Sequence, residues 1–125
     1  MIRLLLVDDE AAVRRGLRMQ LELEPDVRVV GEAGDGAAAV ELAPRLNPDV
    51  ILMDIRMRGM DGIAAVEHLK RVVPRIPVIM LSLHDDEQTR AQAERAGAWA
   101  FVSKCETSTR LLQAIRDAAA QGTLC

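Results

Sequence analysis

Short apolar runs alternate with amphipathic stretches five times along the chain. The apolar runs occupy residues 2–7, 27–33, 50–53, 78–81 and 99–102. Between the first two runs, Val13, Leu17 and Leu21 recur every four residues, which is the spacing of one helix face. Continuous apolar strands separated by helical segments are typical of a parallel sheet covered by helices. The pattern therefore predicts five β-α units and an α/β fold.

The later helical stretches differ in how many large apolar residues they offer to a core. One face carries four apolar residues at spacings of three, three and four: Ile63, Val66, Leu69 and Val73. Asp35 is placed to cap a helix over residues 37–46. Residues 86–96 offer only Ala91, Ala93 and Ala96 as apolar side chains. We expect residues 86–96 to form the most weakly anchored helix.

Length and composition indicate one globular domain. The 125 residues are 50% hydrophobic and 28% charged, which suits a single contiguous core. The net charge is -3, and the 16 Lys and Arg residues are scattered among 19 Asp and Glu residues. Because the basic residues are scattered, the chain lacks the basic stripe of a nucleic-acid binder. With only one Trp, one Phe and no Tyr, it also lacks aromatic platforms on which bases could stack. We expect this domain alone not to bind nucleic acid.

The N-terminal region and the apolar runs bear on localisation. No uncharged apolar run approaches the ~18–20 residues that a membrane span needs. Met1 leads directly into a strand-like segment, without the basic start and apolar stretch of a signal peptide. We expect a cytoplasmic protein that does not bind membranes.

Polar side chains follow four of the predicted strands at the point where each strand ends. Asp8 and Asp9 follow the first strand, Asp54 the third, Ser82 the fourth, and Lys104 comes shortly after the fifth. In open α/β sheets, ligands bind at the carboxyl ends of the strands. Carboxylates that converge there would repel one another unless a cation neutralised them. Mg²⁺ is the natural candidate, because it prefers oxygen ligands and binds through a few carboxylates together with phosphate oxygens.

Each of these residues also has an ordinary structural interpretation. Asp9 alone would be a turn former, Ser82 a strand-end serine and Lys104 a solvated lysine. Asp54 is different because it ends the fully apolar run 50–53, where a charge is costly unless it is used. A carboxylate can attack phosphorus when a metal and cations neutralise the transferred oxygens. The agreement of several strand ends favours a phosphoryl-accepting site around Asp54.

Five short motifs together resemble the receiver domains of two-component response regulators. They lie at residues 6–10, 53–57, 60–62, 81–82 and 101–104. The resemblance covers essentially the whole chain and implies a flavodoxin-like (βα)5 doubly wound fold, with a five-stranded parallel sheet in the order 2-1-3-4-5. Residues 79–86 further resemble the LuxR/NarL-type subgroup of DNA-binding regulators. The chain is then a receiver domain over residues 1–125, and any C-terminal DNA-binding output domain lies outside it.

The resemblance assigns a role to each site residue. It makes Asp54 the phosphoacceptor, and it implies Mg²⁺ held by Asp8, Asp9, Asp54 and the backbone carbonyl of Arg56. Ser82 and Lys104 would contact phosphoryl oxygens during the transfer.

The resemblance also describes a switch. Ser82 and the aromatic Phe101 would be the switch residues. We expect phosphorylation to draw Ser82 inward, to make room for Phe101 to turn toward the interior, and to reposition the helix over residues 86–96.

The implied function is signal transduction rather than enzymatic turnover. A sensor histidine kinase would donate the phosphoryl group, slow self-dephosphorylation would remove it, and the output would control transcription. A homodimer is compatible with the family.

Four alternatives stand beside this interpretation. A haloacid-dehalogenase-type phosphatase would want an Asp two residues beyond Asp54, where Arg56 stands. An FMN carrier would want a phosphate loop after the first strand and aromatic stacking partners. A stand-alone phosphorelay receiver would lack a DNA-binding output. A non-phosphorylated docking scaffold would not need the full set of site residues.

Overall fold

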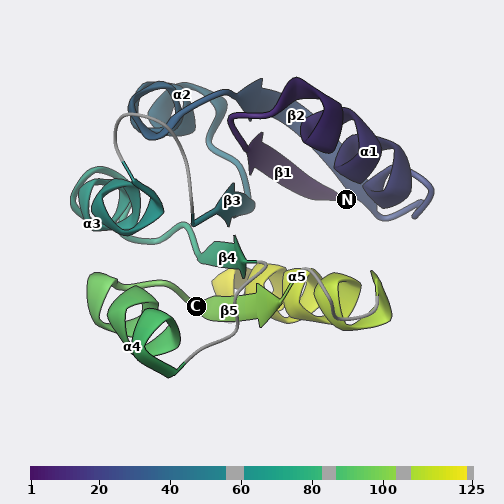
Figure 1. Cartoon of the computed structure of the whole chain (residues 1–125). Helices are drawn as coiled ribbons and strands as arrows, with labels where there is room; N and C mark the ends of the chain where they lie inside the picture. Colours follow the sequence, from purple (N-terminus) through teal and green to yellow (C-terminus); the bar gives the residue numbers. More distant parts are fainter. Residues whose placement is uncertain (56–60, 83–86, 104–107, 124–125) are drawn as a thin grey trace.

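Five strands and five helices alternate along the chain, as the hydrophobic pattern predicts. The computed structural model describes residues 1–55, 61–82, 87–103 and 108–123. The elements are β1 (Ile2–Val7), α1 (Ala11–Leu21), β2 (Val27–Ala33), α2 (Gly36–Leu46), β3 (Val50–Asp54), α3 (Gly62–Val72), β4 (Val78–Ser82), α4 (Glu87–Ala96), β5 (Ala100–Ser103) and α5 (Ser108–Thr123). All strand pairs are parallel, and the sheet order is β2-β1-β3-β4-β5. This is the predicted flavodoxin-like doubly wound sheet (Figure 1).

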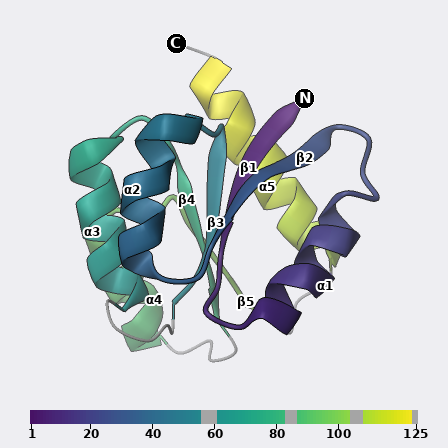
Figure 2. The same cartoon turned by 90° about the horizontal axis from the view of Figure 1, so that it is seen from above.

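Helices cover both faces of the sheet, with α2, α3 and α4 on one face and α1 and α5 on the other (Figure 2). Consecutive side chains of each strand point to opposite faces. In β1, for example, Leu5 packs with the α2–α3–α4 layer, and Leu4 and Leu6 pack with the α1–α5 layer. Each strand therefore contributes to two apolar clusters, which explains why the strands read as continuous apolar runs.

Three strands have bounds that differ by one residue from the predicted ones. β3 continues to Asp54, β4 continues to Ser82, and β5 runs from Ala100 to Ser103. The reason is that backbone pairing continues past the last apolar residue, since Asp54 pairs with Leu81 and Ser82 pairs with Ser103. The polar site residues are thus the last residues of strands rather than the first residues of loops.

Helix α4 has the weakest contact with the core of the three helices on its face. The structure describes all ten of its residues, and Ala93 is the only one that is buried. By contrast, α3 buries Ala65, Val66 and Leu69. The expectation that this is the most weakly anchored helix therefore holds on this face of the sheet, whereas α1 on the other face also buries a single residue, Leu21.

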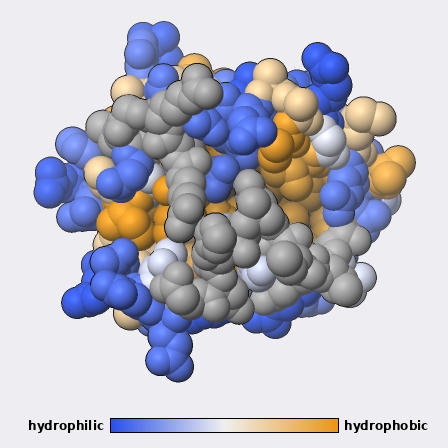
Figure 3. Space-filling model, in the orientation of Figure 1, coloured by the Kyte–Doolittle hydropathy of each residue, from blue (hydrophilic) through white to orange (hydrophobic). Residues whose placement is uncertain are grey.

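The surface carries both hydrophilic and hydrophobic residues. On the face seen in Figure 3, hydrophobic surface occurs in separate areas bordered by hydrophilic residues. Among the described residues, Leu23, Met1 and Met19 are the most exposed large apolar side chains. No helix in the described part of the chain has the length and hydrophobicity needed to cross a membrane.

Candidate phosphoacceptor site

The register of the central strands brings three carboxylates together. Val7 of β1 pairs with Met53 of β3, so the residues that follow each of them, Asp8 and Asp54, lie side by side at the carboxyl edge of the sheet. One carboxylate oxygen from each of Asp8, Asp9 and Asp54 lies within 4.8 Å of the other two. The structure therefore assembles the predicted acidic cluster.

Asp8 is held in place by its backbone and by its side chain. It is 1% exposed, and its amide donates to the carbonyl of Ala33 in β2 over 3.1 Å. Its Oδ1 accepts a 2.9 Å hydrogen bond from the amide of Glu10, which forms a local Asx-type turn. Its carbonyl oxygen accepts a 2.5 Å hydrogen bond from Nη1 of Arg14. The first and third of these bonds hold the backbone of Asp8, and the second holds one oxygen of its carboxylate.

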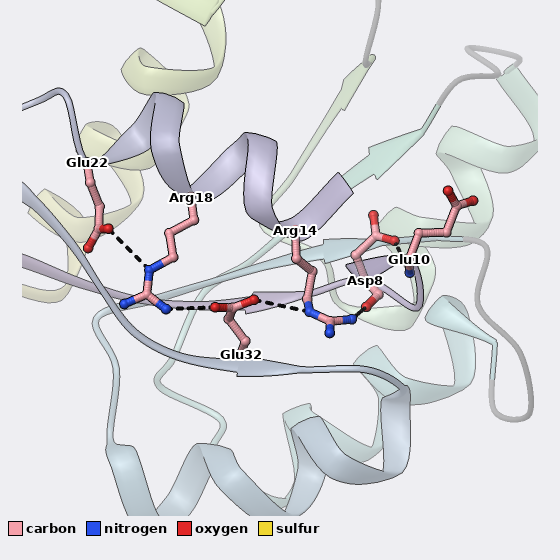
Figure 4. Close-up of polar contacts among 6 residues, drawn as sticks. All are labelled: Asp8, Glu10, Arg14, Arg18, Glu22 and Glu32. Carbon is pink, nitrogen blue, oxygen red and sulfur yellow. Dashed lines mark hydrogen bonds and ion pairs between the residues drawn. The ribbon is translucent and has the colours of Figure 1, made fainter. Parts of the chain in front are cut away.

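Arg14 belongs to a chain of charged side chains that runs along α1 and β2 (Figure 4). Its Nε lies 3.1 Å from Glu32, and Nη1 of Arg18 lies 2.7 Å from the other oxygen of Glu32. Arg18 also pairs with Glu22 over 3.2 Å. The hydrogen bonds from Arg18 and Arg14 hold the pKa of Glu32 below its usual value, although partial burial opposes them. Glu32 therefore stays charged between the two arginines.

The backbone that follows Asp54 packs tightly against the start of α3. The amide of Ile55 donates to Leu81 over 3.0 Å, and the carbonyl of Ile55 accepts from Gly62 over 2.9 Å. A Cβ on Gly62 would lie 2.6 Å from the Cα of Ile55 and 2.8 Å from the carbonyl oxygen of Asp54. Position 62 therefore requires a residue without a side chain. Asp61 caps the same helix, because its Oδ1 accepts from Ala64 over 2.8 Å.

Two serines end the neighbouring strands at the same edge. Ser82 of β4 is 1% exposed and pairs in register with Ser103 of β5, which is 6% exposed. Ser82 follows Leu81, which pairs with Asp54. The structure thus places the predicted hydroxyl residue on the strand next to the candidate phosphoacceptor.

Phe101 lies farther along the sheet and contacts α4. The ring is 5% exposed and belongs to the apolar cluster beneath α2, α3 and α4. The guanidinium carbon of Arg90, on α4, lies 4.8 Å from the ring centroid, within the range of a cation–π contact. The ring already occupies a buried position, so an inward turn is not needed to bury it.

Two predicted site residues cannot be compared with this geometry. Lys104 and the backbone carbonyl of Arg56 lie outside the described residues. Three residues that shape the site were not singled out for a role from the sequence, namely Arg14, Glu32 and Gly62. The sequence signal for Arg14 was only a basic residue in the first helix, which Arg15 and Arg18 share.

Comparison with known proteins identifies the family. The response regulator receiver domain family matches residues 4–116. The chain belongs to this family. The receiver domain is 45% identical over 120 residues to the transcriptional regulatory protein LiaR of Bacillus subtilis, covering 94% of this chain and 56% of LiaR. It is 41% identical to the nitrate/nitrite response regulator protein NarP of Escherichia coli, covering 94% of this chain and 54% of NarP.

Solved structures agree with this assignment and with the LuxR/NarL-type subgroup. The receiver domain of NarL from Mycobacterium tuberculosis superposes with a TM-score of 0.89 at 39% identity, covering 95% of this chain and 96% of that chain. A LuxR-family response regulator from Aurantimonas sp. SI85-9A1 superposes with a TM-score of 0.93 at 32% identity, covering 97% and 86%. The receiver domain spans about half the length of the curated relatives it matches.

Proposed function

We propose that this receiver domain accepts a phosphoryl group on Asp54 from a sensor histidine kinase, with Mg²⁺ bound at the carboxyl edge of the sheet. The observation that carries the proposal is the cluster of Asp8, Asp9 and Asp54, whose ligand oxygens lie within 4.8 Å of one another. The family supports the same chemistry, because receivers of response regulators are phosphoacceptors.

The donor set of this cluster fits Mg²⁺. All three groups are carboxylates, and hard oxygen donors are what Mg²⁺ prefers. Oxygen ligands of one Mg²⁺ ion lie at most about 4 Å apart, and the cluster already brings its ligand oxygens within 4.8 Å of one another. Asp8, Asp9 and Asp54 would hold the ion, together with the backbone carbonyl of Arg56. The bound ion would neutralise charge on the transferred phosphoryl oxygens.

In the transfer step, a carboxylate oxygen of Asp54 forms a bond to phosphorus as the phosphorus–nitrogen bond of a phosphohistidine breaks. The imidazole of the donor is the leaving group, and the product is an aspartyl phosphate. The Ser82 hydroxyl would donate to a phosphoryl oxygen, and the Lys104 ammonium would pair with another. Slow attack of water on the same phosphorus would release inorganic phosphate and regenerate Asp54.

The switch is proposed to act through Ser82, Phe101 and α4. A phosphoryl group on Asp54 would draw the Ser82 end of β4 toward it. Helix α4 follows β4 and is held in the core only by small side chains, the buried Ala93 and the partly buried Ala96, so it can be displaced at low cost. The Arg90–Phe101 contact would then change, because it joins α4 to β5. The surface formed by α4, β5 and α5 would be the output.

The wider role is proposed from the relatives. LiaR, DegU and NarP are named as regulatory proteins, and they are about twice as long as the receiver domain. We propose that the receiver controls a DNA-binding domain outside residues 1–125, in the cytoplasm, and that the regulator forms homodimers.

The phosphoacceptor assignment is tested with acetyl phosphate and Mg²⁺, followed by peptide mass mapping. We expect one labile acyl phosphate on Asp54, and no labelling of Asp54→Asn. The matched control is Asp35→Asn, which removes a carboxylate elsewhere and retains a good helix cap. Undiminished labelling of Asp54→Asn, or equal loss in both variants, would refute the assignment.

A further inference from the structure

We propose that Arg14 is a positioning residue for the Mg²⁺ site, an inference that rests on the proposed function. Its guanidinium joins the carbonyl of Asp8 to the carboxylate of Glu32. In this way it holds the turn that carries Asp8 and Asp9 in the shape that binds the metal.

The geometry supports this role because one rigid group makes two contacts with different elements. Nη1 of Arg14 lies 2.5 Å from the carbonyl oxygen of Asp8, at the end of β1, and Nε lies 3.1 Å from Glu32 in β2. The Arg14 side chain is only 21% exposed and that of Glu32 only 30%. The planar fork of an arginine fixes the directions of its donors toward two acceptors, whereas a lysine ammonium is a point charge without that fixed geometry.

Helix α1 starts directly after this turn. Helix α1 begins after Glu10, which makes no side-chain capping bond, and its first turn contains no acidic residue. The amide of Glu10 donates to Oδ1 of Asp8, so the same short segment supplies both the helix start and a metal ligand. Arg14 reaches back from α1 onto this segment, as Figure 4 shows. A change in Arg14 would therefore alter the direction of the Asp8 carboxylate.

Electrostatics and positioning predict opposite signs for the effect of removing Arg14. A positive charge near a cation site repels the cation, so loss of that charge alone would strengthen Mg²⁺ binding. Loss of the two hydrogen bonds would instead weaken binding, because the ligand turn is no longer held. Removal of groups that orient metal ligands typically costs about 10-fold or more in metal affinity.

Arg18 provides a matched control on the same helix. Its hydrogen bonds go to Glu22 and to the same Glu32 carboxylate that Arg14 contacts. Arg18→Gln therefore removes an equal charge and one contact with Glu32 but keeps the Arg14 bond to Asp8. For this variant we expect Mg²⁺ affinity equal to or slightly above that of the wild type.

The test is calorimetric titration of Mg²⁺ into the wild type, Arg14→Gln, Arg18→Gln and Arg14→Lys, without any phosphodonor. We expect about 10-fold weaker Mg²⁺ binding for Arg14→Gln. We expect an intermediate loss for Arg14→Lys, which keeps the charge but not the fork. Circular dichroism confirms that each variant is folded before titration.

The outcomes separate this proposal from the proposed function. Failure of the wild type to bind Mg²⁺ would contradict the metal site itself. If the wild type binds Mg²⁺ and Arg14→Gln binds it as tightly as Arg18→Gln does, the positioning role is wrong. Should Arg14→Gln fail to fold, Arg14→Lys decides the question, and wild-type affinity for that variant overturns the role.

Discussion

Acidic side chains pair with an arginine at the edge where the strands begin, and they cluster with one another at the edge where the strands end. Where the strands begin, Arg116 of α5 lies 2.9 Å from Asp26 and 2.8 Å from Glu24. The hydrogen bond from Arg116 holds the pKa of Asp26 below its usual value. Where the strands end, a carboxylate cluster is gathered instead: Asp8, Asp9 and Asp54.

The first edge holds charges that join parts of the fold, and the second holds the charges that would bind the proposed Mg²⁺ ion. The Arg116 contacts connect α5 to the segment before β2, which is distant in sequence. The carboxylate cluster brings like charges close together, which costs free energy that a bound cation would recover. Changes at the two edges should therefore respond differently to Mg²⁺ and to pH.

The largest expected effect comes from Gly62→Ala at the carboxyl edge. The new Cβ would overlap the backbone of Ile55 and of Asp54, so the start of α3 must shift. We expect a loss of about 3 kcal/mol in the free energy of unfolding, measured by urea denaturation. Acetyl phosphate labelling of the folded fraction should also fall, because the same shift moves the backbone of Asp54.

Gly16→Ala is the control for that substitution. Nothing lies within 4 Å of the position its Cβ would take on α1. Alanine should therefore stabilise the helix, by about 0.5–1 kcal/mol. Equal losses for the two variants would show that tight packing at the site edge is not the cause.

The second effect is stabilisation by Mg²⁺. At a Mg²⁺ concentration 100 times the dissociation constant, we expect the wild type to gain about 2.7 kcal/mol of stability. Asp9→Asn should lose most of this gain, because it removes one of the three clustered carboxylates. Arg116→Gln should keep the full gain, because Arg116 lies at the other edge. A gain in Asp9→Asn as large as in the wild type would contradict the distinction between the edges.

The smallest effect is that of Arg116→Gln itself, which we expect to lower the urea midpoint modestly at pH 7. Because Arg116 lowers the pKa of Asp26 in the folded state, the contribution is present above the unfolded pKa of about 3.9. It is lost as the pH falls through the folded pKa. The difference between the wild type and Arg116→Gln should therefore shrink below about pH 4.

Arg45→Gln is the matched control for Arg116→Gln. It breaks an exposed pair with Glu41 within α2, whose side chains are 71% and 67% exposed. Such pairs contribute little to stability, so the midpoint should hardly change. A midpoint difference for Arg116→Gln that persists unchanged in acid would show that Asp26 is not its source.

Much of the fold was readable from the sequence because it depends on local periodicity. The apolar runs marked all five strands, and Asp35 caps α2 as predicted, with Oδ1 2.7 Å from the amide of Ala38. The strand ends were misplaced by one residue at Asp54 and Ser82, because pairing with a neighbouring strand continues after the apolar pattern stops.

The acidic members of the site were predictable for a related reason. Parallel strands end at the same edge, so polar residues after apolar runs must gather there. The supporting residues were not predictable. Arg14, Glu32 and Gly62 act through contacts between elements, and their sequence neighbourhoods do not distinguish them from similar residues such as Arg15 or Gly16.

The amino-acid sequence alone determined the order of strands and helices, the apolar faces and the types of side chain that end each strand, because these depend on residues near one another in the chain. Only the tertiary structure decided which arginine reaches Asp8, which acids join α5 to the segment before β2, and why position 62 must be glycine. Those answers depend on distances of a few ångströms between segments far apart in sequence, and such distances exist only after the strands have paired and the helices have packed.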